Sequence, residues 1–195
     1  ENRRLSRCRN WIQRIKSAAE AGKQIKALDR TFIRRMLLRY EVYEESAQLP
    51  EKYTSEDFEN LLKRVHPLPP SLVLAQAANE SGWGGSRFCL KANNIFGEWI
   101  YNREAGLKPK GVPDTAPYRV EVFPTLQASV RSYMHNLNTH WAYKDFRKLR
   151  ARQDGTTNSL QLVQGLENYS ERGEAYVRDI SSLIRSNDYR QYDRF

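Results

Sequence analysis

The sequence has few of the residues on which disulfide frameworks and metal sites depend, and it lacks a long apolar run. Its two cysteines, Cys8 and Cys89, are too few for a disulfide framework, and the spacing of its three histidines fits no metal site. We expect two buried cysteines, with a single bridge between them as the alternative. No run approaches the roughly 18 apolar residues of a membrane-spanning helix. The sequence therefore predicts neither a disulfide-stapled domain nor a membrane-spanning chain, and we expect no metal and no cofactor.

Proline and glycine are scarce at both ends of the chain. All 8 prolines lie between residues 50 and 124, and 6 of the 10 glycines lie between residues 82 and 111. Because these residues interrupt regular structure, their distribution predicts helices at both ends and an irregular centre. In that centre, residues 118–124 alternate as a strand does, and a partner strand is expected near residues 95–99. The predicted fold class is therefore mainly α, with a small two-stranded β-lobe.

The spacing of apolar residues and of capping residues predicts where the helices begin. Residues 1–50 contain the pattern of two helices separated by Gly22. A further helix is predicted over residues 157–167. The remaining helices are expected to begin at side chains with a hydroxyl group, which are Thr54, Ser71, Thr125 and Ser170. The helix that begins at Ser71 should end near Ser81.

Positive charge is confined to the N-terminal fifth of the chain. Residues 1–39 hold 12 Lys and Arg against 3 Asp and Glu, whereas residues 40–195 hold 20 of each sign. We therefore distinguish a basic N-terminal helical region, residues 1–50, from a domain over residues 51–195. A basic region favours a polyanionic partner; the alternative is a solvated helix face whose long side chains cover apolar surface. No nucleic-acid partner is expected, because the region lacks interleaved aromatic side chains.

One carboxylate, Glu80, stands near the end of the apolar stretch SLVLAQAANESGWGGSRF, residues 71–88. The negative end of the helix dipole and the apolar surroundings both disfavour its ionised form, which suits an acid that must donate a proton. The glycines that follow let the backbone turn and leave space beside the carboxyl group. The alternative is an exposed residue at the end of a helix, followed by a glycine C-cap. Nearby, Trp83, Phe96 and Trp99 offer flat apolar faces that could stack on sugar rings.

The stretch PPSLVLAQAANESGWGGSRF, followed by NNIFGEW, closely resembles the Bax-type bacterial N-acetylglucosaminidases over residues 67–99. These proteins are relatives of the flagellar peptidoglycan hydrolase domain and lie in the lysozyme-like superfamily. The resemblance extends more loosely through LQASVRSYMHNLNTH and LENYSERGEAYVRDI. It implies a lysozyme-like helical domain over residues 51–195 with a small β-lobe, preceded by an N-terminal helical arm. This fold agrees with the helix plan that the apolar spacing predicts.

The resemblance also implies roles for single residues. Glu80 matches the catalytic glutamate of the family, and Tyr169 matches a cleft tyrosine that would position water or steady a developing cation. For Tyr169 and Tyr176 the alternative is core packing, because they are seven residues apart on one helical face. Glycosidases usually need two carboxylates, and the second has no convincing motif here. The predicted substrate-binding residues are Trp83, Asn93, Asn94, Phe96, Trp99 and Tyr176, and the candidates for the second acid are Glu98, Glu104 and Glu121.

The function that these features predict is a peptidoglycan hydrolase that cleaves the β-1,4 bond after N-acetylglucosamine, with Glu80 as the general acid. A lytic transglycosylase on the same scaffold and a non-catalytic cell-wall-binding protein are the alternatives. The expected partners are peptidoglycan glycan strands and, through residues 1–39, an anionic envelope surface. We expect a monomer in the cell envelope, periplasmic or secreted, with any signal or anchor upstream of Glu1.

Overall fold

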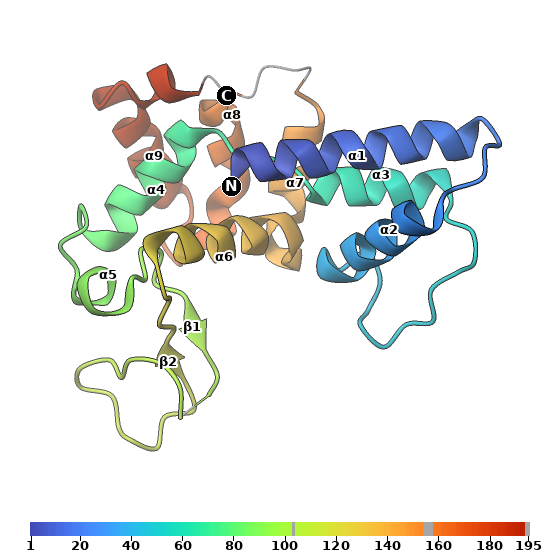
Figure 1. Ribbon diagram of the computed structural model, residues 1–195. Helices are drawn as coiled ribbons and strands as arrows, with labels where there is room; N and C mark the ends of the chain where they lie inside the picture. The colour runs from blue at the N-terminus through green and yellow to red at the C-terminus, as the bar shows by residue number, and fades with distance from the viewer. Residues whose placement is uncertain (103, 154–157, 194–195) are drawn as a thin grey trace.

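The computed structural model describes residues 1–102, 104–153 and 158–193, and in these ranges the chain is mainly helical (Figure 1). The α-helices are α1 (Asn2–Glu20), α2 (Ala27–Arg39), α3 (Ser55–Arg64), α4 (Pro70–Ser81), α5 (Arg87–Ala92), α6 (Leu126–Thr139), α7 (Lys144–Ala151), α8 (Ser159–Leu162) and α9 (Glu174–Ser186). Short 3-10 helices are η1 (Trp141–Tyr143), η2 (Val163–Tyr169) and η3 (Tyr189–Tyr192), and the strands are β1 (Trp99–Ile100) and β2 (Arg119–Val120). The predicted fold class, mainly α with a small two-stranded lobe, is confirmed.

The helix starts predicted from hydroxyl caps are confirmed at two positions and wrong at two others. Thr54 caps α3 in a capping box with Asp57, and Thr125 caps α6. The helix α4 begins one residue earlier than Ser71, because Pro70 occupies its first turn. The last helix, α9, begins after Gly173 and not at Ser170. The helix predicted over residues 157–167 is a short α8 followed by η2, and residue 157 lies outside the described residues.

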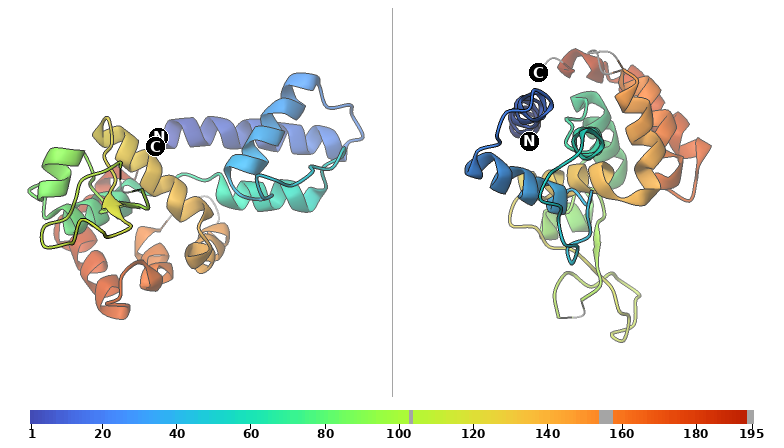
Figure 2. Two further views of the ribbon diagram at one scale, coloured as in Figure 1. Left: turned by 90° about the horizontal axis from the view of Figure 1, so that it is seen from below. Right: turned by 90° about the vertical axis from the view of Figure 1, so that its right-hand side faces the viewer.

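The N-terminal helices share one hydrophobic core with the rest of the described chain. The helices α1, α2 and α3 lie together on one side of the molecule (Figures 1 and 2). Trp11 of α1 stacks on Phe32 of α2 with ring centroids 4.0 Å apart, and it donates its indole N–H to Asp29 at 2.7 Å. Buried side chains of these helices belong to the same cluster as those of α4, α6 and α9. The division of the chain near residue 50 stays a prediction.

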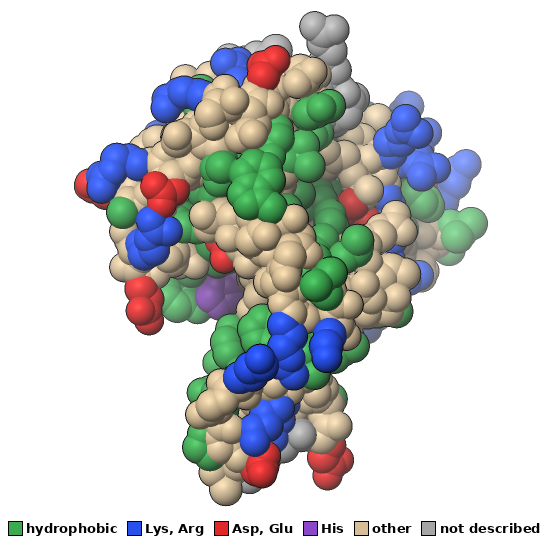
Figure 3. Space-filling model, turned by 90° about the vertical axis from the view of Figure 1, so that its left-hand side faces the viewer, with side chains coloured by type: hydrophobic (Ala, Val, Ile, Leu, Met, Phe, Trp, Pro, Cys, Tyr) green, Lys and Arg blue, Asp and Glu red, His purple; other side chains and the backbone are tan. Residues whose placement is uncertain are grey.

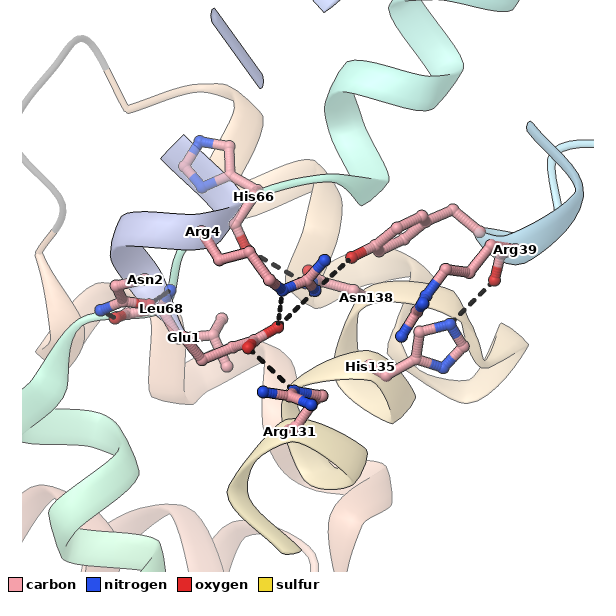
Figure 4. Close-up of polar contacts among 10 residues, drawn as sticks. Glu1, Asn2, Arg4, Arg39, His66, Leu68, Arg131, His135 and Asn138 are labelled. Atoms are coloured by element: carbon pink, nitrogen blue, oxygen red, sulfur yellow. Dashed lines mark hydrogen bonds and ion pairs between the residues drawn. The ribbon is translucent and has the colours of Figure 1, made fainter. Parts of the chain in front are cut away.

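The start of α1 is fixed to two other parts of the chain by polar contacts (Figure 4). The Glu1 carboxylate pairs with Arg4 and, at 3.2 Å, with Arg131 of α6. The side-chain amide of Asn2 donates to the Leu68 carbonyl at 2.7 Å and accepts from the Leu68 N–H at 3.1 Å. These contacts join α1 to α6 and to the segment that enters α4.

Four arginines bind the carbonyl groups at the ends of three helices, and none of the four forms an ion pair among the described residues: Arg9, Arg64, Arg147 and Arg150. Cations are favourable there because the helix dipole is negative at its C-terminus and the last carbonyls lack helical partners. The bonds run from Arg9 to Val65 after α3 at 3.4 Å, from Arg64 to Tyr40 after α2 at 3.1 Å and to Thr139 of α6 at 2.9 Å, from Arg147 to His140 after α6 at 2.8 Å, and from Arg150 to Lys63 of α3 at 2.8 Å.

The lobe below α6 is held by one short antiparallel pairing, in which Trp99 faces Val120 (Figure 1). A bridge between Leu107 and Val120 adds a third segment. Gly106 allows this close approach, because a Cβ atom there would lie 2.7 Å from the Val120 carbonyl oxygen. The partner strand lies at Trp99–Ile100 and so follows the segment predicted for it by a few residues.

A chain that starts near residue 50 tests whether the later residues fold alone. Its α3 would lose the cover of α1 and α2 over Phe58 and Leu61, which are 1% and 0% exposed in the full chain. Each newly exposed side chain forfeits about 2 kcal/mol of burial free energy. We therefore expect the truncated chain to aggregate when analysed by size-exclusion chromatography. A soluble truncated chain with a cooperative thermal transition would show instead that residues 51–195 form an independent domain.

Candidate active site

The local sequence places Glu80 at a sharp turn. It lies in the last turn of α4, and three residues that follow the helix, Gly82, Trp83 and Gly84, have φ values of 55°, 57° and 81°. Glycine adopts this left-handed conformation readily, whereas a tryptophan there is strained. The Ser81 hydroxyl holds the turn, since it accepts from the Gly84 N–H at 2.7 Å and donates to a helix carbonyl at 2.6 Å. The backbone therefore leaves the helix directly beside the Glu80 carboxyl group.

A chain of hydrogen bonds leads from the core to Glu80. The Tyr133 hydroxyl donates to the amide oxygen of Gln76, and the Gln76 amide nitrogen donates to the Tyr176 hydroxyl at 2.8 Å. The Tyr176 hydroxyl in turn donates to Oε1 of Glu80 at 2.8 Å. Gln76, Tyr133 and Tyr176 are 0%, 1% and 1% exposed, so these groups cannot exchange their partners for bulk water. The chain joins α4, α6 and α9 and fixes one oxygen of the carboxyl group.

Aromatic rings surround this hydrogen-bonded chain. Tyr169 stacks on Tyr176 with centroids 5.3 Å apart and planes 12° from parallel, and the Tyr143 ring centroid lies 5.9 Å from that of Tyr169. Burial is the main reason that the pKa of Tyr169 lies well above its usual value, so its phenol stays neutral. Gly165 allows η2 to bring Tyr169 here, because a Cβ at that position would lie 2.5 Å from the Phe146 Cα of α7.

Among the three candidates for the second acid, the structure distinguishes Glu98. Its Oε2 accepts from the Ser132 hydroxyl at 2.7 Å, and its Oε1 is buried without a partner in the described residues. Burial raises the pKa of Glu98 to about 7, against the lowering effect of the Ser132 hydrogen bond. Burial also raises the pKa of Tyr143, with smaller contributions from Glu80 and Glu98, so both carboxyl groups lie within electrostatic reach of one phenol.

The other two acids have different surroundings. Glu104 is exposed in the lobe, where its backbone N–H donates to Asn102 at 2.9 Å. Glu121 is half-buried, and its backbone N–H donates to the Glu98 carbonyl at 2.9 Å. Burial raises the pKa of the Glu121 carboxyl group. Neither acid is oriented by a side-chain hydroxyl among the described residues, as Glu98 is by Ser132.

The predicted substrate-binding residues separate into buried and exposed groups. Asn94 is 1% exposed and binds the Glu98 and Glu121 carbonyls at 2.8 and 2.9 Å, so it shapes the segment that carries Glu98. Asn93 similarly donates to the Phe123 carbonyl at 2.9 Å. Phe96 is buried and stacks on Tyr133 at 3.8 Å, and Tyr176 is buried against Glu80.

Trp83 and Trp99 are the exposed members, at 65% and 50%. They extend from the turn after α4 and from the lobe, respectively. Hydrophobic side chains gather on the face of the molecule where the helical body meets the lobe (Figure 3). Both tryptophans are therefore exposed to solvent, whereas Asn94, Phe96 and Tyr176 are buried.

Sequence reasoning missed Gln76, Ser132 and Tyr143. Gln76 had a detectable signal, because it is the only amide in the apolar part of α4 and lies four residues before Glu80, on the same helical face. Ser132 and Tyr143 had none, since their partners lie far away in the sequence. Within the described ranges, no group of three or more His, Cys, Asp and Glu side chains could hold a metal ion, and both cysteines are free.

A family model described as glucosaminidase, mannosyl-glycoprotein endo-beta-N-acetylglucosaminidase, matches residues 55–189. The chain belongs to the glucosaminidase family. It is also 35% identical over 133 residues to the protein named Protein bax from Escherichia coli (strain K12), a match that covers 65% of this chain and 46% of that protein. The resemblance to Bax-type glucosaminidases is thereby confirmed, although the chain spans about half the length of this relative.

No solved structure matches the glucosaminidase chain. The family is one of glycosidases, and the matched range includes Glu80, Glu98 and Tyr169. In the part of the chain that the structure describes, no helix is both long and apolar enough to cross a bilayer. The roles of single residues in this glucosaminidase therefore rest on the geometry given above.

The buried carboxyl of Glu98 should make the stability of this glucosaminidase fall as pH rises. Its pKa of about 7 in the folded state lies above the usual 4.5, so the folded protein binds the proton more tightly. The stabilisation from this proton is complete below about pH 4.5 and is lost as pH rises through about 7. The free energy of unfolding falls by about 3 kcal/mol over that range. In urea unfolding, Glu98→Gln should abolish this fall between about pH 5 and about pH 8, whereas the exposed control Glu104→Gln should retain it. Equal slopes for the two variants would contradict the burial of Glu98.

The left-handed backbone at Trp83 gives a second test. Trp83→Gly and Trp83→Ala remove the same ring, but only alanine retains the strain, so the glycine variant should be more stable by about 1 kcal/mol. Binding is measured in a Glu80→Gln background, so that the ligand is not cleaved. By calorimetry, both variants should bind a chitin oligosaccharide more weakly than the protein that retains Trp83, and to the same extent. An alanine variant as stable as the glycine variant would disprove the strain, and undiminished binding would remove Trp83 from the site.

Proposed function

We propose that this glucosaminidase hydrolyses the β-1,4 bond after N-acetylglucosamine in peptidoglycan glycan strands. The observation that carries the proposal is the attachment of the Glu80 carboxyl group, whose Oε1 receives hydrogen bonds from Tyr176 at 2.8 Å and from Asn79 at 3.1 Å. No described residue donates to Oε2. A proton on this carboxyl group therefore resides on Oε2, where it can pass to the leaving oxygen of the glycosidic bond.

Glu98 is the proposed second acid. A group whose pKa is about 7 changes its protonation near neutral pH, which suits a residue that accepts a proton from water or steadies positive charge at the anomeric carbon. Ser132 orients its carboxyl group from α6, and Asn94 fixes its backbone. Asn94 and Ser132 are positioning residues in this proposal, since neither would touch the sugar.

The aromatic residues have two proposed roles. Trp83, in the turn after α4, and Trp99, in the lobe, are both exposed, and they would stack on sugar rings. Tyr169 lies against Tyr176, which binds Glu80, and its neutral phenol would place water or steady the cation that develops. Tyr176, Gln76 and Tyr133 would hold Glu80 in position.

The proposed location is the cell envelope, periplasmic or secreted, where the glycan strands lie. The basic residues of α1 and α2 would attach the protein to an anionic envelope surface. Several of them, including Arg3, Arg7, Arg14, Arg34 and Arg35, are exposed and therefore free for such contact. We propose that the protein acts there as a monomer without a cofactor.

Replacement of Glu80 by glutamine tests the central assignment. Glutamine keeps an oxygen for the Tyr176 hydrogen bond but cannot deliver a proton, so the rate should fall by about 10²–10⁴ while the fold is retained. Release of soluble fragments from purified peptidoglycan measures the rate, and circular dichroism checks the fold. The matched control Glu104→Gln should stay active, because Glu104 is exposed in the lobe. A Glu80→Gln variant as fast as the wild type would overturn the assignment.

Mass spectrometry of the released fragments separates the proposal from its alternatives. A hydrolase leaves reducing N-acetylglucosamine ends, whereas a lytic transglycosylase leaves anhydro-sugar ends. Binding of glycan without any cleavage, unaffected by Glu80→Gln, would instead indicate a non-catalytic wall-binding protein.

A further inference from the structure

A second concave site lies between α3 and α7, outside the residues proposed for catalysis. It has a volume of about 560 Å³ and is bordered by η1 and by the segment after α2. Among the described residues that line it, six side chains are cations and none is an acid. The residues that line it are Val42, Asn60, Lys63, Arg64, Trp141, Lys144, Arg147, Lys148, Ala151 and Arg152. We call this site the α3–α7 groove.

The cations of the α3–α7 groove form a fixed inner pair and an exposed rim. Arg64 and Arg147 lie inside, where each uses Nη1 to bind backbone carbonyls at 2.8–3.1 Å. The exposed rim consists of Lys63, Lys144, Lys148 and Arg152. Of these, Lys148 pairs with Asp145 at 2.8 Å, in an ion pair whose side chains are 55% and 77% exposed. The structure shows no ion pair for the other five lining cations among the described residues.

Among the described residues, positive charge in and next to the groove therefore outweighs negative charge. Burial and, secondarily, Arg64 lower the pKa of Arg147 to about 10. Arg150 binds the carbonyl of the lining residue Lys63 at 2.8 Å. Burial and the charges of Arg147 and Arg9 lower the pKa of Arg150 to about 9, and its Nε and Nη1 are buried without a partner among the described residues. Glu41 is the acid whose charge acts on Arg64 and Arg147, but it lines a neighbouring hollow. An anion in the groove would offset this repulsion.

Trp141 gives the groove an apolar face. Its side chain is 79% exposed, although an indole ring in water forgoes favourable burial. It lies in η1 directly before α7, and Trp141 and Lys144 both line the groove. Sites that bind small ligands combine such an aromatic surface with a few polar groups that fix orientation.

We propose that the α3–α7 groove binds an anionic glycan. Its acidic groups would pair with Lys and Arg side chains, and the apolar face of one sugar ring would stack on Trp141. Guanidinium groups suit this ligand because their fixed N–H groups match the oxygens of phosphate, sulfate and carboxylate. The site binds a wall or surface polymer independently of Glu80, so it does not depend on the proposed hydrolysis.

The composition of the groove favours a glycan over other polyanions. Single-stranded nucleic acid uses several aromatic platforms along a basic track, and the described lining residues include one aromatic ring. A membrane surface would be met by an apolar face, whereas the large apolar side chain that the groove exposes is Trp141 alone among its lining residues. One ring inside a concave set of cations fits a short, charged sugar segment.

The test uses the full chain and a heparin hexasaccharide as the anionic glycan probe. Maltohexaose supplies sugar rings without charge, and tripolyphosphate supplies charge without sugar rings. Calorimetry should show binding of the hexasaccharide and none of maltohexaose, and tripolyphosphate should bind more weakly than the hexasaccharide. The hexasaccharide should also shift tryptophan emission to shorter wavelength, and Trp141→Phe should remove this shift.

Charge variants locate the site. The double variant Lys144→Gln/Arg152→Gln should weaken hexasaccharide binding about tenfold, since two exposed ionic contacts are lost. Arg34→Gln/Arg35→Gln changes the net charge equally on the exposed face of α2 and should leave the affinity within about twofold. Glu80→Gln should bind as the wild type does, whether or not it has lost hydrolytic activity.

Two results would overturn the proposal. Equal losses of affinity in the two double variants would show attraction by net charge alone. Tripolyphosphate binding as tight as that of the hexasaccharide, together with an emission shift that Trp141→Phe leaves unchanged, would show an anion site that does not recognise sugar. The exposed positions of the substituted side chains keep the fold intact, which unchanged thermal melts would verify.

Discussion

The side-chain amide of Gln76 is the group on which the arrangement of the candidate site depends. It is fully buried, and its oxygen and nitrogen are both used, one by Tyr133 of α6 and the other by Tyr176 of α9. A buried amide left without a partner costs about 1–3 kcal/mol. The packing of α4 against α6 and α9 is therefore restricted to the register that satisfies this amide. Glu80, one turn further along α4, receives its orientation from the same Tyr176 hydroxyl.

Much of the fold could be predicted from the sequence because its causes are local. Thr54 and Thr125 cap helices through residues three positions away, and the Gly-rich and Pro-rich centre interrupts helices wherever it occurs. The prediction failed at Ser71, whose hydroxyl donates to Asp193, 122 residues away, while Pro70 sets the start of the helix. A tertiary partner so distant leaves no local pattern.

The candidate site was predictable only in part, for the same reason. Glu80 and the exposed Trp83 stand in a recognisable stretch, whereas the preference for Glu98 over Glu104 and Glu121 depends on burial and on the Ser132 hydroxyl of α6. The α3–α7 groove could not be predicted from the net charge, because residues 40–195 carry equal numbers of acidic and basic side chains. A net charge of zero over residues 40–195 does not show how charge is distributed, and six cations line the groove with no acid among the described lining residues.

The helix α7 contributes both to the packing of the candidate active site and to the α3–α7 groove. Its Phe146 backbone meets Gly165 so closely that no side chain fits, and this contact sets the position of η2 and Tyr169. The same helix supplies Lys144, Arg147 and Lys148 to the groove. During evolution, a shift of α7 that improved one surface would disturb the other. Substitutions in α7 would therefore affect the candidate active site and the groove together. We expect the sequence of α7 to diverge more slowly than its short length and exposed lysines would suggest.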